Sequence, residues 1–130
     1  MTELTHLERA VLVKLLEGAH PLLERLRHQL SSCRVSHREM TGHGFYTYFD
    51  IEEENAASGG STVILGDVCA EVDGMEEGAG FLLYIEQGHL TMLEGYAYDE
   101  PWPCTIAGYT LSYNAGEQRD WNALWKVLEE

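Results

Sequence analysis

The residues best suited to recognition chemistry stand close together, in a short stretch that ends near position 103. They are acidic or aromatic: Glu94, Tyr96, Tyr98, Asp99, Glu100 and Trp102. Pro101 and Pro103 stiffen the chain around Trp102, and a rigid tryptophan beside carboxylates is a good anchor for a cationic or aromatic group. The alternative is a structural role, in which the tryptophan covers the end of a sheet and the two acids after Tyr98 cap turns.

Catalysis in the same stretch is the weaker hypothesis. His89 and Cys104 could serve as base and nucleophile, and Glu94 with Asp99 could exchange protons as a carboxyl pair. The sequence contains no Gly-x-Ser-x-Gly elbow and no known cysteine-enzyme motif. We therefore predict a non-enzymatic protein. A small-ligand domain or enzyme, with a pocket near Glu94 and Tyr96, is the alternative.

Metal and phosphate chemistry finds little support in the sequence. The six histidines are scattered, and no His-x-x-x-His or Cys-x-x-Cys spacing occurs. The acidic turn at 73–77 lacks the ligand order of a calcium-binding loop. The glycine-rich stretch at 58–62 has no lysine and precedes a strand, so a helix N-terminus that would hold a phosphate is missing. The sequence therefore predicts no metal and no cofactor.

The charge of the chain is strongly negative and unevenly distributed. Its 130 residues include 22 acidic and 8 basic ones, for a formal net charge of −14. Residues 1–40 hold six basic and five acidic residues, whereas no lysine or arginine occurs between Glu39 and Gln118. Because nucleic acids and anionic membranes are bound by clustered basic residues, this balance argues against both as partners. It favours a cationic partner or, more simply, a well-solvated surface.

The compartment is predicted from the cysteines and the N-terminal residues. Cys33, Cys69 and Cys104 are odd in number and widely spaced, which argues against a disulfide framework. The N-terminus shows no basic leader, and no run approaches the roughly 20 apolar residues of a membrane span. We expect a cytoplasmic protein whose residues 1–130 form one domain, since domains of about 100–150 residues are the commonest.

Helical periodicity appears at both ends of the chain. The apolar residues at 4, 7, 11 and 15 predict a first helix, with Thr5 and Glu8 as a capping box or Thr2 as the alternative N-cap. Gly18 ends this helix and Pro21 begins a second one, whose apolar stripe runs to Leu30. A last helix is predicted over 117–128. The two N-terminal helices would form a hairpin.

A period of two dominates the middle of the sequence. It predicts strands near 34–41, 44–51, 62–72, 79–87, 89–98 and 105–113. Turn residues at 41–44, 73–78 and 87–88 separate several of these strands. In the strand at 62–72, alternation places Ile64 on the same side as Val68. We expect an α+β domain, in which the helical hairpin packs on a mostly antiparallel sheet of about six strands.

All seven tyrosines lie in the predicted sheet, and Tyr46 and Tyr48 alternate with apolar residues on one strand. Tyrosine provides a large contact area at low entropic cost, so tyrosines mixed with carboxylates are typical of recognition surfaces. Strand propensity alone also favours tyrosine. If that face is exposed, a homodimer competes with a foreign partner for it.

These features predict an acidic binding protein, in the manner of an immunity or inhibitor protein that neutralises a basic protein partner. Binding would use Tyr46, Tyr48 and the stretch from Glu94 to Trp102. The alternatives are a homo-oligomeric domain without a macromolecular partner and the small-ligand domain or enzyme described above.

Two segments also resemble those of small bacterial proteins whose function is uncharacterised. The segments are Met40–Phe49 and the string around Leu93–Tyr96 with Pro101–Pro103, and the likeness extends over about the middle two-thirds of the chain. The resemblance implies a bacterial cytoplasmic domain and implies no activity or catalytic residue.

Overall fold

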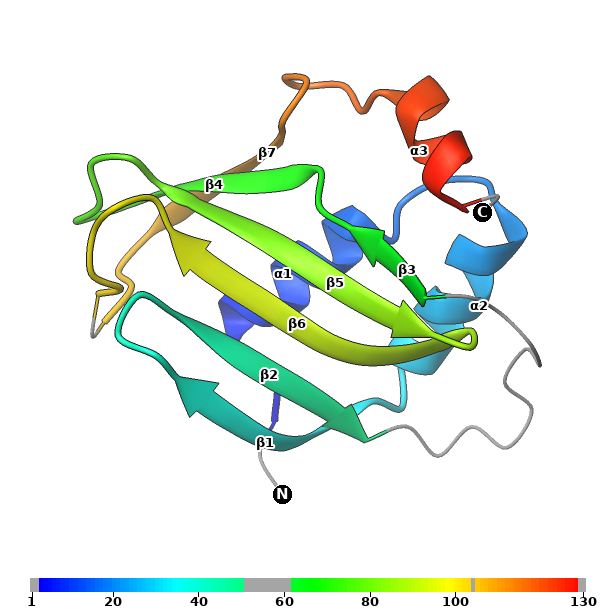
Figure 1. The fold of residues 1–130 in the computed structure, drawn as a ribbon, viewed down its shortest axis with the longest axis horizontal. Helices are drawn as coiled ribbons and strands as arrows, with labels where there is room; N and C mark the ends of the chain where they lie inside the picture. Colours follow the sequence, from blue (N-terminus) through cyan, green and yellow to red (C-terminus); the bar gives the residue numbers. More distant parts are fainter. Residues whose placement is uncertain (1–2, 51–61, 104, 129–130) are drawn as a thin grey trace.

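The computed structural model of the protein describes residues 3–50, 62–103 and 105–128. These residues form an α+β fold in which helices and an antiparallel sheet lie in two layers (Figure 1). The predicted fold class is therefore confirmed. In chain order the elements are α1 (His6–Leu15), α2 (Pro21–Leu30), β1 (Arg34–Met40), β2 (Gly44–Asp50), β3 (Thr62–Leu65), β4 (Val68–Val72), β5 (Ala79–Glu86), β6 (His89–Ala97), β7 (Tyr109–Tyr113) and α3 (Trp121–Leu128).

The helix starts follow from local capping chemistry. The capping box of α1 is complete: the Glu8 amide donates to the Thr5 hydroxyl at 3.1 Å, and the Thr5 amide donates to the Glu8 carboxylate at 2.8 Å. Pro21 opens α2, as predicted. The last helix begins at Trp121 rather than near 117, because the Asp120 carboxylate accepts from the Ala123 amide and caps the helix there.

The sheet is antiparallel at every strand pair of the described residues. Six strands follow the order β1-β2-β6-β5-β4-β7, and β3 is a seventh that also pairs with β5. The strands β3 and β4 thus lie end to end along one side of β5. The turns at 41–43 and 87–88 close two hairpins, as the sequence predicted; in the second, Gln87 and Gly88 have φ values of 53° and 78°.

The prediction of one strand over 62–72 is wrong. The chain bends at Gly66 and Asp67, and Asn114 donates hydrogen bonds to the carbonyl oxygens of both residues. A Cβ on Gly66 would lie 2.5 Å from the end of the Leu82 side chain, so a larger residue at the bend would displace that side chain. Because these two residues interrupt the alternation, Ile64 is 43% exposed on the side opposite Val68, and its predicted place is also wrong.

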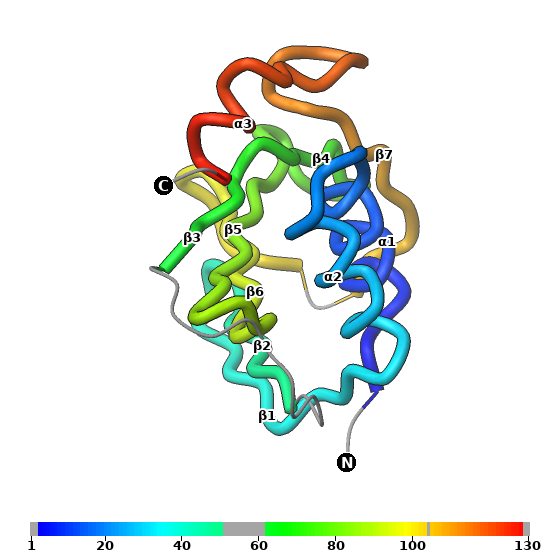
Figure 2. Tube along the Cα trace, turned by 90° about the vertical axis from the view of Figure 1, so that its right-hand side faces the viewer, coloured from blue at the N-terminus to red at the C-terminus, as the bar shows by residue number. Residues whose placement is uncertain are grey.

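The helices α1 and α2 cover one face of the sheet (Figure 2). Alternate residues of β5 point into this layer, and Phe81, Leu83 and Ile85 are almost completely buried there. The buried apolar residues of both helices and of the strands form one continuous core. The other face of the sheet, toward the viewer in Figure 1, is crossed by no helix of the described residues. We call it the uncovered face.

One ion pair connects α1 to the sheet, and a second joins the segment before α3 to the bend between β3 and β4. The guanidinium of Arg38 in β1 donates to both carboxylate oxygens of Glu8 at 2.8 and 2.6 Å, and the Thr47 hydroxyl donates to the same carboxylate. Glu8 is only 2% exposed, yet these hydrogen bonds hold its pKa below the usual value despite burial. At the other end of α1, Arg119 pairs with Asp67 at 2.6 and 3.0 Å.

Candidate functional site

Residues that face one another on adjacent strands project from the same side of the sheet, so the strand register defines the uncovered face. Three rows of cross-strand neighbours run over it, perpendicular to the strands. The glutamate row is Glu39, Tyr46, Glu94 and Leu82. The tyrosine row is His37, Tyr48, Met92, Tyr84 and Ile64. The glycine row is Gly44, Tyr96, Gly80, Cys69 and Ser112.

Glu94 lies at the centre of the uncovered face and is half-buried. Its direct neighbours are Tyr46 on β2 and Leu82 on β5. The hydroxyl of Tyr84 donates to the Glu94 carboxylate at 3.3 Å. Desolvation, the negative charge of Glu94 and this hydrogen bond raise the pKa of Tyr84. The carboxylate is therefore held in place by a phenol that stays protonated.

The tyrosines at the two sides of Glu94 are also held by neighbouring groups. The His37 ring stacks on Tyr48, with 4.1 Å between centroids and 13° between planes. Tyr96 and Tyr98 meet edge to face at 5.4 Å. Both rings lie over Gly80, where a Cβ would be 2.5 Å from the Tyr96 ring and 2.6 Å from the Tyr98 hydroxyl.

Tyr98 is the most exposed tyrosine of this face, at 41%. Desolvation and the hydrogen bond with Tyr96 nevertheless raise the pKa of Tyr98 to about 12. An exposed ring that rests on a glycine and a second ring loses little freedom when a partner contacts it. The uncovered face thus presents tyrosines that are largely fixed before binding.

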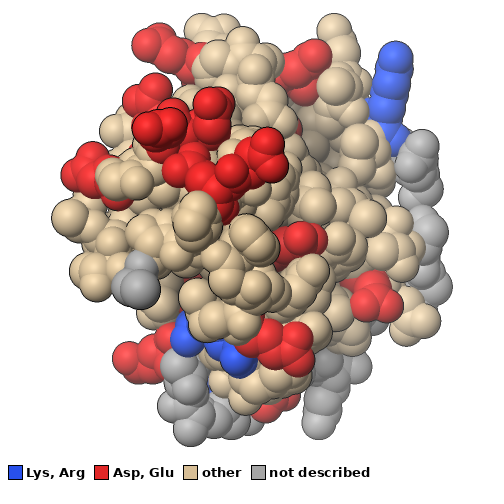
Figure 3. Space-filling model, turned by 60° about the vertical axis from the view of Figure 1, so that its left-hand side comes forward, with Lys and Arg blue, Asp and Glu red and all other residues tan. Residues whose placement is uncertain are grey.

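Beside the tyrosines, carboxylates gather at one end of the sheet. The Glu100 carboxylate accepts hydrogen bonds from the Glu76 and Glu77 amides, at 3.1 and 2.7 Å, and so joins the segment after β6 to the turn between β4 and β5. We call this group the acidic end; its members are Glu71, Asp73, Glu76, Glu77, Asp99 and Glu100. Figure 3 shows Asp and Glu side chains gathered there, without Lys or Arg among them.

Trp102 lies on the opposite side of the sheet from the five tyrosines of the uncovered face. Its amide donates to the Gly42 carbonyl at 2.8 Å, and its ring meets Phe45, a core residue, edge to face at 5.3 Å. It lines a pocket of about 480 Å³ between α1 and the 102–109 segment, together with Arg38 and Tyr109. The eight predicted binding residues therefore do not form one surface. Five lie on the uncovered face, Asp99 and Glu100 at the acidic end, and Trp102 elsewhere.

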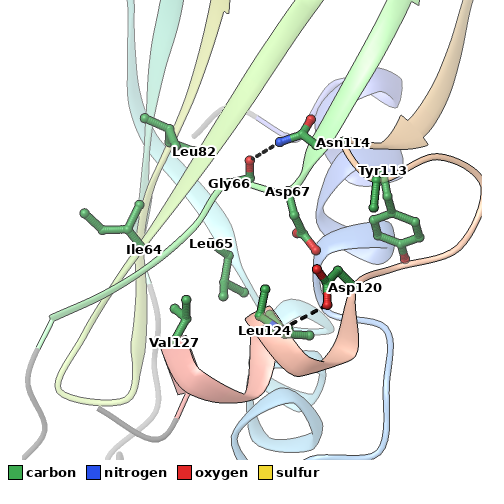
Figure 4. Close-up of a pocket in the computed structure, with 12 residues that line it drawn as sticks. Ile64, Leu65, Gly66, Asp67, Leu82, Tyr113, Asn114, Asp120, Leu124 and Val127 are labelled. Atoms are coloured by element: carbon green, nitrogen blue, oxygen red, sulfur yellow. Dashed lines mark hydrogen bonds between the residues drawn. The ribbon is translucent and has the colours of Figure 1, made fainter.

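A groove between α3 and β3 was not predicted from the sequence (Figure 4). It has a volume of about 510 Å³, and its wall is mostly apolar, with Leu65 and Leu124 facing each other across it. Ile64 and Leu82, its rim residues, also belong to the uncovered face. In the sequence, the groove could have been indicated by these two apolar residues, which occupy strand positions on the uncovered face. A single strand over 62–72 would turn Ile64 to the side of Val68, so the sequence prediction does not bring Ile64 and Leu82 together.

The structure describes two of the three thiols, Cys33 and Cys69. Burial raises the pKa of Cys33 to about 11, which keeps it protonated at neutral pH. The Cys69 sulfur lies 3.4 Å from the Ser112 hydroxyl on the uncovered face. Cys104, the predicted candidate nucleophile, is outside the described residues. Within those residues, no three His, Cys, Asp or Glu side chains are grouped so that they could hold a metal ion.

Comparisons with known proteins add no family. No family model matches the chain, and searches of curated proteins and of solved structures return no significant match. None of the helices in the described residues combines the length and apolar character needed to cross a membrane. The resemblance to small bacterial proteins and the cytoplasmic location stay predictions.

Proposed function

We propose that this protein binds a basic protein partner through the uncovered face and the acidic end, without catalysis, as an immunity or inhibitor protein does. The observation that supports the proposal is a sheet face on which fixed tyrosines surround a central glutamate and which none of the helices in residues 3–50, 62–103 and 105–128 crosses. Sheets commonly expose one face to water, but such a face is then mostly polar. Here it carries Tyr46, Tyr48, Tyr84, Tyr96 and Tyr98.

The negative charge of this surface favours a basic protein as the partner. Only two arginines occur in the described strands, and neither adds free positive charge to the centre of the face. Arg38 points toward the helix layer and pairs with Glu8, whereas Arg34 lies directly opposite Asp50 at a corner of the sheet. The acidic end continues the negative surface beyond β6. A basic protein would be attracted to it over long range, which raises the association rate at low salt.

The same charge disfavours a second copy of the chain as the occupant. A two-fold interface places the same patch against itself, so Glu39, Glu94 and their neighbours would face like charges. Juxtaposed like charges cost several kcal/mol in an interface. A basic partner would instead be attracted by these same carboxylates.

The test starts from the partner and then maps the surface. Proteins retained from host extract by the immobilised protein at low salt are identified, and the retained protein is purified for affinity measurement. Three forms of the chain are compared: the natural sequence, Tyr98→Ser on the uncovered face, and Val13→Ser as the matched control. Val13 is also an exposed apolar residue (55%), but it lies on α1, in the helix layer.

The expected partner is basic, and its affinity falls about tenfold for Tyr98→Ser while Val13→Ser binds like the natural protein. Its association should also slow steeply as salt rises. Retention that is insensitive to Tyr98, or a partner without excess positive charge, contradicts the proposal. Sedimentation that shows a dimer lost on Tyr98→Ser, with no partner retained, supports the homo-oligomer instead.

A further inference from the structure

We infer, on the basis of that proposed function, that Glu94 is the centre of a subsite for an arginine side chain of the partner. The position follows from the register of the sheet. Tyr46 is the direct neighbour of Glu94 on β2, and adjacent cross-strand side chains start about 5 Å apart. Glu39 is the next residue along the row, about 10 Å from Glu94 at two strand spacings. A tyrosine ring thus stands between two carboxylates.

The Glu94 carboxylate is prepared to accept a cation. It is half-buried at the middle of the sheet, where the low polarity of the neighbours Leu82 and Met92 strengthens an ionic hydrogen bond. Tyr84 fixes one oxygen with its hydroxyl. Since a carboxylate can accept about four hydrogen bonds, the bond from Tyr84 leaves capacity for the forked donors of a guanidinium.

Arginine fits this geometry better than lysine. A guanidinium is planar, so it can lie against the Tyr46 ring while its edge donates two parallel hydrogen bonds to Glu94. The ammonium of lysine is a compact, strongly hydrated charge. It packs less well on the Tyr46 ring and cannot donate two parallel hydrogen bonds to the Glu94 carboxylate. Glu39, on the far side of Tyr46, adds a second negative charge that faces the same cation or the next basic residue of the partner.

The subsite is tested with peptides of defined sequence. The probe is acetyl-Gly-Arg-Gly-Arg-Gly-amide, with counterparts that carry lysine or the neutral analogue citrulline at both positions. Binding to the isotope-labelled protein is followed by amide chemical shifts in NMR spectra, which give both the location and the dissociation constant. The expected shifts centre on Tyr46, Leu82 and Glu94, with the arginine peptide bound several-fold more tightly than the lysine peptide and the citrulline peptide bound least.

Two variants separate a specific contact from general attraction. Glu94→Gln should weaken binding of the arginine peptide about tenfold. Glu86→Gln removes the same charge from an exposed position at the end of β5, on the same face, and should change binding less than twofold. Tyr84→Phe keeps the ring and the net charge but loses the hydrogen bond to Glu94, so a several-fold loss is expected. Circular dichroism and thermal unfolding verify that each variant folds.

Failure of the arginine subsite and failure of the proposed function give different results. Equal binding of the arginine and lysine peptides, or equal effects of Glu94→Gln and Glu86→Gln, would overturn the arginine subsite. Shifts located away from Glu94 would do the same. The basic partner could still depend on Tyr98 in any of these cases, which would leave the proposed function standing. If the partner's affinity is instead insensitive to Tyr98, the proposed function fails.

Discussion

Gly80 allows a direct test of whether the fixed tyrosines matter for binding. In Gly80→Ala, the new Cβ would lie 2.5 Å from the Tyr96 ring and 2.6 Å from the Tyr98 hydroxyl, about 1 Å closer than ordinary contact. Both atoms belong to side chains at the surface, so the rings can move outward. The backbone of β5 does not have to shift, and the fold should persist.

The cost in stability is small because opposing effects nearly cancel. Loss of the edge-to-face contact between Tyr96 and Tyr98 costs about 0.5–1.5 kcal/mol. Replacing a glycine within a strand returns about 0.5–1 kcal/mol of conformational entropy. The free energy of unfolding of Gly80→Ala should therefore stay within about 1 kcal/mol of the natural protein. Its affinity for the basic partner should fall about tenfold, because the displaced rings no longer match the partner.

Gly95→Ala is the matched control, since it places the same methyl group on the other face of the sheet. There the Cβ would lie 2.3 Å from the ring of Phe45, a buried residue that has no room to move. Overpacking of this kind costs about 1–3 kcal/mol. Urea unfolding measures both stabilities, and surface plasmon resonance measures the affinity of Gly80→Ala. Unchanged affinity in Gly80→Ala, with its rings displaced, would refute the reasoning.

Three further outcomes are expected. Arg38→Met leaves Glu8 buried without its cation and should destabilise the protein by about 3 kcal/mol at pH 7 in urea unfolding. The pKa of Glu8 is lower in the folded than in the unfolded chain, so ionised Glu8 stabilises the fold above its unfolded pKa. This contribution is lost as the pH falls through the folded pKa. The difference in free energy of unfolding between Arg38→Met and the natural protein should therefore be smaller at pH 3 than at pH 7. Arg119→Met removes the partner of Asp67, whose side chain is 31% exposed, and the donor to the carbonyl oxygens of Leu15 and Glu17; it should cost about 1–3 kcal/mol at pH 7, and a cost below about 1 kcal/mol would contradict these assigned contacts. The Cys33 thiol should react with a disulfide reagent far more slowly at pH 8 than in the urea-unfolded chain.

Predictions from local signals agree with the structure. The capping box at Thr5, the proline at the start of α2 and the two-residue turn at Gln87 and Gly88 are interactions within a few residues, which the sequence contains completely. The alternation in β2 and β5 also gives the right side for each residue, because neighbouring side chains on a strand must point to opposite faces.

Predictions that required long-range information failed or were not possible. The break at Gly66 depends on hydrogen bonds from Asn114, 48 residues away along the chain. The pairing of Glu8 with Arg38 depends on where α1 crosses the sheet. Arg119 is the first basic residue after Arg38 in the sequence, which is a visible signal, but its partner is decided only by the folded chain.

The sequence by itself determined most of the elements, the side to which most strand residues point, and the negative charge of the sheet region. The tertiary structure decided which strands are neighbours, and therefore that Tyr46, Glu94 and Leu82 form one row across the uncovered face. It also placed Trp102 on the other side, beside Phe45. The physical reason is that alternation within a strand is set by covalent geometry, whereas register and strand order are set by packing of the whole core.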